Sequence, residues 1–332
     1  MSDKNVPSGI NYLSYLMSLF QNRSFHLIVA FTMIYIVWGS TYLAIAFTVQ
    51  TIPPFFAIGS RFVVAGLLLF AFLKLKGVES PTFNQVVNAS LVGMLTLGVG
   101  TGLVAWAEQY IASGMAALLV TSVPFWMVLL DWTMLKGEAP NRFVIAGLVL
   151  GMGGIVLLVG PEVAQGIRSL NGLAVMAVVF ASVSWSVGSL RSKMMAMPVN
   201  LFMSSAVQML AGGVAVTILS LVAGESSRFS FAGLSTDSLI GWWYLVVFGS
   251  LGGFSSYVWL LRNAPPKQIA SYAFVNPVVA VILGAWLANE TVLPRMVIAI
   301  VVLVVSVALI VVFGKAKKVR VIELKTTAKA EF

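Results

Sequence analysis

Residues 296–313 read MVIAIVVLVVSVALIVVF, an apolar run without a single charged side chain. A helix needs about 20 mainly apolar residues to cross the roughly 30 Å hydrocarbon core of a bilayer, so this run predicts a membrane-spanning helix. The whole chain has the same character: 59% of its 332 residues are hydrophobic, 9% are charged, and the mean hydropathy is +0.98. Soluble domains carry about 25% charged residues. We therefore expect an integral membrane protein, and we interpret the net charge of +9 as membrane topology rather than as a nucleic-acid-binding surface.

Nine further segments have a similar length and composition. Eight of the ten segments contain no charged side chain, and the connections are rich in proline, glycine, asparagine and charged residues. Strands of an outer-membrane barrel would alternate polar and apolar residues, which these segments do not. The prediction is an all-α integral membrane fold with ten spanning helices, at residues 27–49, 55–75, 86–106, 113–135, 143–160, 173–190, 201–223, 239–261, 268–288 and 296–313.

The positions of lysine and arginine predict the orientation, because cytoplasmic loops carry an excess of both residues. With both termini in the cytoplasm, sixteen of these side chains lie inside the cell, and only Arg168, Arg228 and Arg295 lie outside it. Without the C-terminal tail the excess is still ten to three. An even number of spans agrees with both termini on the same side.

The two ends of the chain lie outside the predicted spans. Residues 1–26 lack the continuous apolar core and small-residue cleavage site of a removable signal peptide. A short helix at the membrane surface and a disordered cytoplasmic segment fit this region equally well, since five apolar residues recur at helical spacing: Ile10, Leu13, Leu16, Met17 and Phe20. Residues 314–332 form a basic tail, which we expect to anchor the last helix on the cytoplasmic side.

The chain also contains an internal duplication, which predicts one repeat at 27–160 and a second at 173–313. Two offsets relate the halves, and they differ by a six-residue slip that fits in the loop before the eighth helix. An offset of 147 residues places Trp38 over Trp185, Arg61 over Gln208, Ala65 over Gly212 and Gly66 over Gly213, and an offset of 153 places Gly100 over Gly253, Trp106 over Trp259, Pro124 over Pro277 and Arg142 over Arg295.

Five spans in each half force the two repeats into opposite orientations in the membrane. This is the plan of secondary transporters, whose substrate site lies near the midplane between the repeats. At 1.5 Å per residue, Trp38, Pro124, Trp185 and Pro277 all fall near the centre of the bilayer. We therefore expect a central cavity at this depth.

Six short motifs resemble the drug/metabolite transporter superfamily, in particular its EamA-type members with two five-helix repeats. In chain order they are WGSTY at 38–42, IGSRFVVAG at 58–66, ALLVTSVPFW at 117–126, GE at 137–138, SYAFVNPVVAVILG at 271–284 and NE at 289–290. The resemblance covers roughly residues 31–314. It implies export of small metabolites, commonly amino acids or related compounds, by alternating access across a bacterial inner membrane.

Trp38 and Trp185 are candidates for the walls of the cavity, with Ser40 and Thr41 beside the first. Small residues such as Gly39 also allow close packing between membrane helices, which is the simpler explanation for that glycine. A tryptophan at mid-depth is less easily explained by packing, because its N–H requires a partner and the residue prefers the membrane interface. Its aromatic face suits an apolar side chain, an aromatic ring or a soft cation.

Pro124 and Pro277 each remove one backbone hydrogen bond in mid-helix and free a carbonyl group. They could act as hinges or form static kinks. Polar neighbours favour a polar patch that faces the cavity: Ser122 beside the first proline, and Tyr272 and Asn276 beside the second. Asn276 is costly in lipid and is expected to face inward.

Arg61 and Glu108 form a predicted charged pair or gate near the outer surface, because a charge at that depth must be paired or reach the interface. The alternative is that Arg61 contacts a carboxylate of the substrate. The second half keeps hydrogen bonding but not the charge at this position, since Gln208 is the counterpart of Arg61.

Asp131 lies near the cytoplasmic end of the fourth span. A salt bridge to Lys136 or Arg142 is the plain interpretation, and a protonatable group that couples proton entry to transport is the alternative. Glu138 and Glu290 begin the connections to the fifth and tenth helices, where we expect capping or loop roles.

Other classes of function fit less well. The chain has no cysteine and one histidine, His26, so we expect no metal site, no cofactor and no catalytic relay. An intramembrane enzyme would need clustered acidic or histidine residues, and a channel usually needs rings of like residues from several subunits. We expect a monomer whose partners are a small-molecule substrate and lipid, and no nucleic acid. Import or exchange of a sugar-type metabolite is the alternative within transport.

Overall fold

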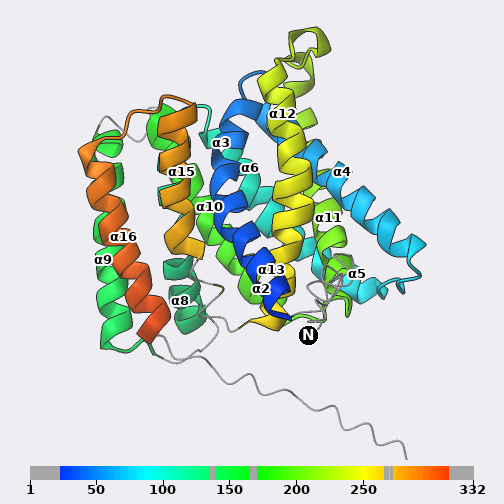
Figure 1. Ribbon diagram of the computed structural model, residues 1–332, viewed down its shortest axis with the longest axis horizontal. Coiled ribbons are helices and arrows are strands. Elements are labelled where there is room, and N and C mark those ends of the chain that lie inside the picture. The colour runs from blue at the N-terminus through cyan, green and yellow to red at the C-terminus, as the bar shows by residue number, and fades with distance from the viewer. Residues whose placement is uncertain (1–22, 135–138, 165–169, 265–268, 270–271, 314–332) are drawn as a thin grey trace, which may run out of the picture.

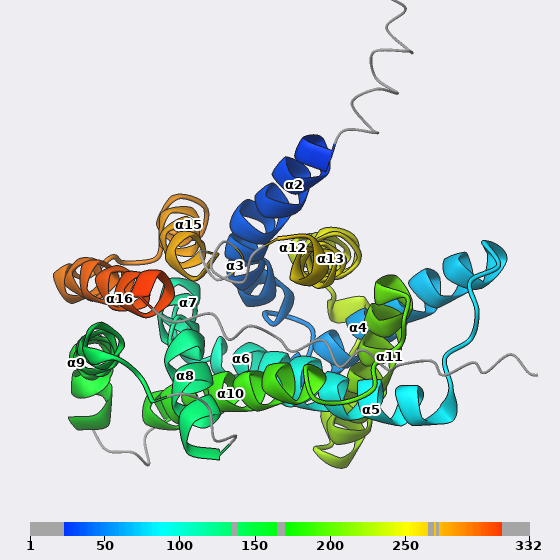
Figure 2. The same cartoon turned by 90° about the horizontal axis from the view of Figure 1, so that it is seen from below.

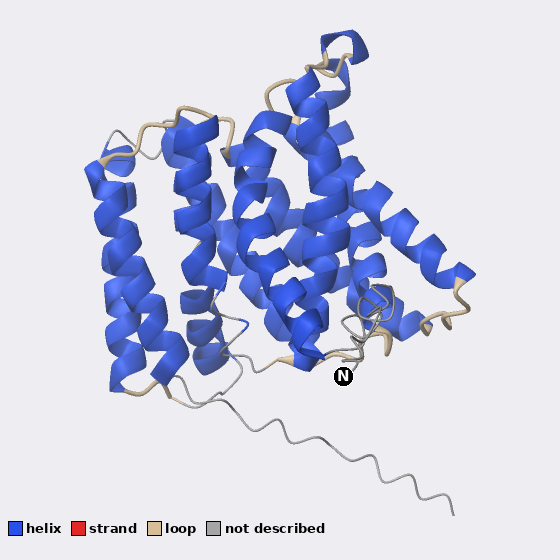
Figure 3. Ribbon diagram, viewed as in Figure 1, coloured by secondary structure: helices blue, strands red, loops and turns tan. Residues whose placement is uncertain are grey.

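The computed structural model describes residues 23–134, 139–164, 170–264, 269 and 272–313. These residues form helices joined by turns and short loops, and no strand occurs among them (Figure 3). The predicted all-α fold is therefore confirmed.

Five helical columns make up the first half of the described chain. The second and fifth columns are single helices, and the others consist of consecutive segments. In chain order the elements are α2 (Arg23–Thr32), η1 (Met33–Val37) and α3 (Trp38–Thr48); α4 (Pro54–Leu75); α5 (Phe83–Gly93), η2 (Met94–Thr101) and α6 (Gly102–Ala107); α7 (Ser113–Val120) and α8 (Val123–Met134); and α9 (Arg142–Ala164).

The second half also forms five columns, but only its third column consists of consecutive segments. Two single turns, η3 (Glu225–Ser227) and η4 (Phe231–Gly233), lie in the connection after its second helix. The elements are α10 (Leu170–Ser192); α11 (Leu201–Val222); α12 (Thr236–Tyr244), η5 (Leu245–Phe254) and α13 (Ser255–Asn263); α15 (Tyr272–Leu287); and α16 (Pro294–Phe313).

Local sequence signals explain where several helices begin. Proline opens α4 at Pro54, where a missing N–H costs no intrahelical bond. A capping box begins α5, since Thr82 accepts from the backbone of Gln85 and the Gln85 side chain accepts from the backbone of Thr82. Asn200 caps α11 in the same manner, by accepting from the backbone N–H of Met203.

The helices have the length and surface of membrane spans. Among the residues that the structure describes, eight helices are long and apolar enough to cross a bilayer, and two shorter apolar helices cover Arg142–Leu158 and Val275–Leu287. Each of the ten predicted segments coincides with one of these helices. On α16, Ile298, Val301 and Val305 are exposed while Leu303 and Ile310 are buried, so one face of this apolar helix is available to lipid.

Helices of the first half pack against their counterparts in the second half (Figures 1 and 2). The helices α4 and α11 pack along each other, as do α9 and α16, and α7 packs against α15. In each pair the second helix is the counterpart of the first under the offsets of the sequence. The column containing α3 packs on that containing α12, and α10 packs on η2 and α6 in the corresponding way. This exchange of partners is the pattern that a two-fold relation between the halves would produce.

Three segments are π-helical, a geometry that is rare and concentrated at functional sites. The segments η2 and η5 occupy corresponding places in the third and eighth columns, because residues 94–101 shifted by 153 positions give 247–254. The segment η1, just before Trp38, has no such counterpart, since residues 180–184 lie within the α-helix α10. The halves therefore differ in the helix that carries the first tryptophan.

The fourth column is interrupted, whereas Pro277 lies inside α15 without ending it. The helix α7 ends at Val120, and α8 begins at Val123. Pro124 has no N–H to donate to the carbonyl of Val120, and the same loss at Pro277 leaves α15 continuous. The two prolines therefore have different local surroundings, and whether either acts as a hinge stays a prediction.

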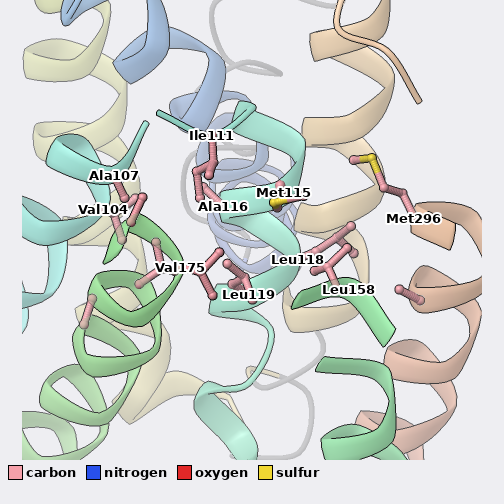
Figure 4. Close-up of a cluster of buried hydrophobic side chains, with 14 of the residues drawn as sticks. Val104, Ala107, Ile111, Met115, Ala116, Leu118, Leu119, Leu158, Val175 and Met296 are labelled. Carbon is pink, nitrogen blue, oxygen red and sulfur yellow. The ribbon is translucent and has the colours of Figure 1, made fainter. Parts of the chain in front are cut away.

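A buried apolar cluster joins the two halves on one side of the molecule. Figure 4 shows Leu118 and Leu119 of α7 pointing toward residues of α9 and α10, among them Leu158 and Val175. Met296 of α16 belongs to the same cluster. The interior beside the central helices is therefore closely filled on this side.

Candidate functional site

A cavity lies between the halves of the chain. Its walls come from four columns of the first half and from the columns of α10, η5 and α15 in the second half. The predicted residues that line it are Trp38, Thr41, Arg61, Trp185, Tyr272 and Asn276. A smaller adjoining pocket of about 230 Å³ includes both Pro124 and Pro277 among its walls.

Four aromatic side chains meet at one end of the cavity. Trp38 is their centre, with ring centroids 5.1 Å from Tyr257, 5.6 Å from Tyr272 and 6.1 Å from Trp185. Its contacts with Tyr272 and Trp185 are edge-to-face, an arrangement that aromatic rings favour. We refer to Trp38, Trp185, Tyr257 and Tyr272 as the aromatic cluster.

The backbone of the eighth column fixes the position of Trp38. The indole N–H donates to the carbonyl oxygen of Gly249 at 3.2 Å, which supplies the partner that a tryptophan at mid-depth requires. A Cβ atom on Gly253 would lie 2.5 Å from the indole nitrogen, so only glycine leaves room for the ring. Gly100, the counterpart of Gly253, lies against Trp185 in the same way, with 3.3 Å from its would-be Cβ to the ring.

Arg61 lies deep in the cavity wall with 5% of its surface exposed. Its Nε donates to Ser250 Oγ at 2.8 Å, and its guanidinium carbon lies 4.6 Å from the centroid of the Phe62 ring. The terminal nitrogen NH1 has no hydrogen-bond partner among the described residues. The predicted pair with Glu108 is wrong, because within the described residues the guanidinium donates to a serine of the second half and neither carboxyl oxygen of Glu108 has a partner.

Glu108 follows α6 and is 7% exposed. Both of its carboxyl oxygens lack a hydrogen-bond partner within the described chain. Burial raises the pKa of Glu108 well above its usual range, and the nearby charge of Glu290 raises this pKa further. Glu108 is therefore not the counter-ion of Arg61.

Glu290 caps the fourth column from the opposite half of the chain. Its carboxylate accepts from the backbone N–H groups of Ser113 (2.9 Å) and Gly114 (3.1 Å) at the beginning of α7. Negative charge is favourable at a helix N-terminus. The predicted capping role of Glu290 is confirmed, and Glu138 and Lys136 lie outside the described residues.

Asn276 connects the cavity wall to η1. In the orientation that gives its amide nitrogen acceptors, it donates to the carbonyl oxygens of Ile34 (2.9 Å), Tyr35 (3.1 Å) and Tyr272 (3.2 Å). Two of these carbonyls belong to the π-helical segment, whose backbone is thus satisfied by a side chain of another helix. The expectation that Asn276 faces the protein interior is confirmed, and most of its hydrogen bonding is used on backbone.

Three predicted residues lie away from the cavity walls. Ser40 bonds to Val37 O at 2.7 Å and to the hydroxyl of Tyr244 at 2.6 Å. Ser122 accepts from the indole of Trp126 one turn away at 3.2 Å. Asp131 is half-buried near the end of α8, and no ion pair joins it to Arg142 in the described residues. The two serines form hydrogen bonds with nearby groups and are not among the residues that line the cavity.

Several residues of the site were not predicted from the sequence. Tyr42, Phe62 and Phe254 line the cavity, Tyr257 completes the aromatic cluster, and Ser250 holds Arg61. A buried serine or tyrosine inside an otherwise apolar span is the signal that could have revealed the last two. The phenylalanines carry no such signal, because they resemble lipid-facing residues.

The fold and its central cavity define a polytopic membrane transporter. The chain belongs to the EamA-like transporter family, whose model matches residues 26–160 and 172–312. The resemblance noted in the sequence is thereby confirmed.

Individual relatives agree with this assignment. The chain is 39% identical to "Uncharacterized inner membrane transporter YedA" of Escherichia coli strain K12. The match extends over 259 residues and covers 78% of this chain and 81% of the relative. It is 24% identical to "Protein PagO" of Salmonella typhimurium (87% and 94% covered) and 23% identical to "Uncharacterized transporter YoaV" of Bacillus subtilis (76% and 85% covered). A solved crystal structure, 18% identical, superposes with a TM-score of 0.63 over 89% of this chain and 100% of that chain, which shows a shared fold.

Proposed function

We propose that this protein is a secondary-active exporter of small organic metabolites in a bacterial inner membrane. Residues 27–160 and 173–313 act as two inverted repeats with both termini in the cytoplasm, and the central cavity binds the substrate. The protein has no enzymatic activity and works as a monomer.

The cavity between corresponding helices is the observation that carries this proposal. Substrates of secondary transporters bind at the interface of their repeats near the midplane. The first and third columns line the cavity from Trp38 to Ile45 and from Leu97 to Val104, and both stretches run toward the predicted outer face. The aromatic cluster lies at the opposite end. This arrangement supports alternating access, in which we propose that the aromatic cluster closes the cavity toward the cytoplasm.

Counterflow in proteoliposomes tests the transporter mechanism. Vesicles are preloaded with a panel of amino acids, aromatic cations, organic acids and sugars, and uptake of the labelled compound is followed. We expect saturable counterflow for at least one organic metabolite and its loss in Trp185→Ala, because the cavity wall is removed. Flux that never saturates and shows no counterflow would indicate a channel, and counterflow restricted to sugars would favour the alternative substrate class.

Adjacent residues of α3 provide a matched test of the cavity itself, since the chain has no cysteine of its own. Thr41 lines the cavity, whereas Ser40 turns to Tyr244. We expect Thr41→Cys to react with a water-soluble thiol reagent and to be protected by a transported compound, while Ser40→Cys stays unreactive. Equal reactivity of both cysteines, or none at position 41 with flux intact, would place the substrate path elsewhere.

A further inference from the structure

The charge balance of the cavity points to one chemical class of substrate. Arg61 contributes a positive charge that stays protonated in proteins. Its Nε is occupied by Ser250, but NH1 has no partner among the described residues. A buried charge without a counter-ion is costly, so a ligand of opposite charge would be favoured beside Arg61.

The described walls of the cavity supply no counter-charge. None of the residues that line it is aspartate or glutamate. Its other polar groups are neutral, namely Thr41, Thr101, Ser182, Asn276 and the tyrosine hydroxyls. Asn276 uses its amide nitrogen on backbone carbonyls, and Thr41 donates to Trp38 O at 2.6 Å. The net charge of the lining is therefore positive.

Arg61 belongs to the lining of the cavity, and its guanidinium packs against the backbone of Gly249. A Cβ atom on Gly249 would lie 3.1 Å from Nη2 of Arg61 and 3.2 Å from the Thr41 methyl group, so a glycine permits this close approach. Arginine binds carboxylates through paired N–H groups. A single arginine matches one carboxylate better than a doubly charged phosphate.

The rest of the lining is apolar or aromatic. Trp38 and Trp185 present their rings toward the cavity, together with Phe62 and Phe254. Burying an apolar body against them is favourable in proportion to the apolar area removed from water. An ammonium group bound here would meet aromatic faces but no carboxylate, since no acid lines the described walls.

We propose that the substrate is a small organic monoanion, whose carboxylate binds Arg61 and whose apolar body lies against Trp38 and Trp185. This inference rests on the transport function proposed above and narrows it from metabolites in general to carboxylates without a compensating ammonium group. Only the first half supplies a charged residue at this position. Its counterpart in the second half, Gln208, is neutral and donates to Ser204 Oγ at 3.0 Å.

Four probes with the same aromatic body and different charge test the proposal on the purified, detergent-solubilised full chain. They are 3-phenylpropionate, phenylalanine, 3-phenylpropionamide and phenethylammonium, and binding is measured by calorimetry. We expect the anion to bind about ten- to hundred-fold more tightly than the amide, which corresponds to a charge-assisted hydrogen-bonded contact. The zwitterion should bind less tightly than the anion, and the cation should bind most weakly.

Variants assign the preference to Arg61. Arg61→Gln, which copies the neutral residue of the second half, should abolish the advantage of the anion over the amide. Arg61→Lys should keep part of it, and Arg228→Gln, an exposed arginine far along the chain, should keep all of it. If Arg61→Gln fails to fold, the ranking of the four probes on the wild-type protein decides the question.

The remaining outcomes also decide the proposal. Equal binding of anion and amide, tighter binding of the cation, an unchanged anion preference in Arg61→Gln, or no binding of any probe at millimolar concentration would each overturn it. Counterflow separates this inference from the transport function. Anion binding that depends on Arg61 without counterflow would refute transport alone, whereas counterflow of other solutes that is insensitive to Arg61→Gln would refute the carboxylate site alone.

Discussion

Glu108 shows how a single side chain can make stability depend on pH. Its folded-state pKa is raised by burial and by Glu290, so the folded protein holds the proton more tightly than the unfolded chain, whose carboxyl pKa is about 4.3. The stabilising contribution is complete below that value and is lost as pH rises toward the folded pKa. Above it, a buried charge without hydrogen bonds remains.

Replacing this carboxyl by a neutral isostere should remove the pH dependence. We predict that Glu108→Gln has a higher melting temperature than the wild type at alkaline pH, and that the difference shrinks as pH falls toward 5. Thermal unfolding in detergent between pH 5 and pH 9 measures it. Glu79→Gln, at an exposed position, serves as the control for loss of an acidic charge. Parallel curves for Glu108→Gln and the wild type would show that Glu108 does not titrate in this range.

At the residue scale, the sequence identified which side chains were unusual but not their partners. Trp38, Trp185 and Asn276 line the cavity as expected, because an indole or amide group inside an apolar span needs a partner, and Arg61, predicted as half of a charged pair, lines it as well. The pairing of Arg61 with Glu108 was wrong, since depth along two helices does not determine which faces meet. The actual partner, Ser250, lies 189 residues away in the chain.

The elements of this fold were largely predictable, because a span of about 20 apolar residues is a strong signal. The π-helical segments were not. The sequence of η2, MLTLGVGT, has the apolar and small residues of an ordinary membrane helix. The geometry of η1 depends instead on the amide of Asn276 reaching its carbonyls from α15, and that contact exists only after the helices have packed.

The two corresponding contacts, Trp38 with Gly253 and Trp185 with Gly100, should differ in how well they tolerate an added methyl group on the glycine. We predict that Gly253→Ala costs about 1–3 kcal/mol and lowers flux, because the new Cβ would lie 2.5 Å from the Trp38 indole nitrogen and displace the ring. Gly100→Ala should be milder, since its Cβ would lie 3.3 Å from Trp185. Melting temperatures and counterflow of both variants provide the comparison. A larger effect at Gly100 would contradict this view of the two tryptophans.

At the scale of the whole molecule, the halves are tied together by carboxylates of the second half. Glu225, 4% exposed, accepts from the backbone N–H groups of Phe55 (3.3 Å) and Phe56 (2.8 Å) at the beginning of α4 and from Ser220 Oγ (2.9 Å). The corresponding loop of the first half offers only the exposed Glu79, and α11 is capped by its own Asn200. The contact is therefore not repeated at the opposite face.

We predict that Glu225→Gln lowers the free energy of unfolding by about 1–3 kcal/mol, because charge-assisted hydrogen bonds to a helix N-terminus are lost. Glu79→Gln should leave it unchanged. Thermal unfolding of both variants at neutral pH measures the difference. If both substitutions lower the free energy of unfolding equally, the hydrogen bonds of Glu225 to α4 do not stabilise the fold.

The position of Glu225 also has a mechanical consequence. It joins α4 to the end of α11 at one extremity of the longest contact between the halves, and the other extremity lacks this tie. The two helices are therefore joined at one end and can move apart at the other. A helix of 22 residues is about 33 Å long, so a rotation of α4 by one degree about the joined end would shift its other end by about 0.6 Å. Leverage of this kind converts a small rotation near Glu225 into a larger displacement at the far side of the bilayer.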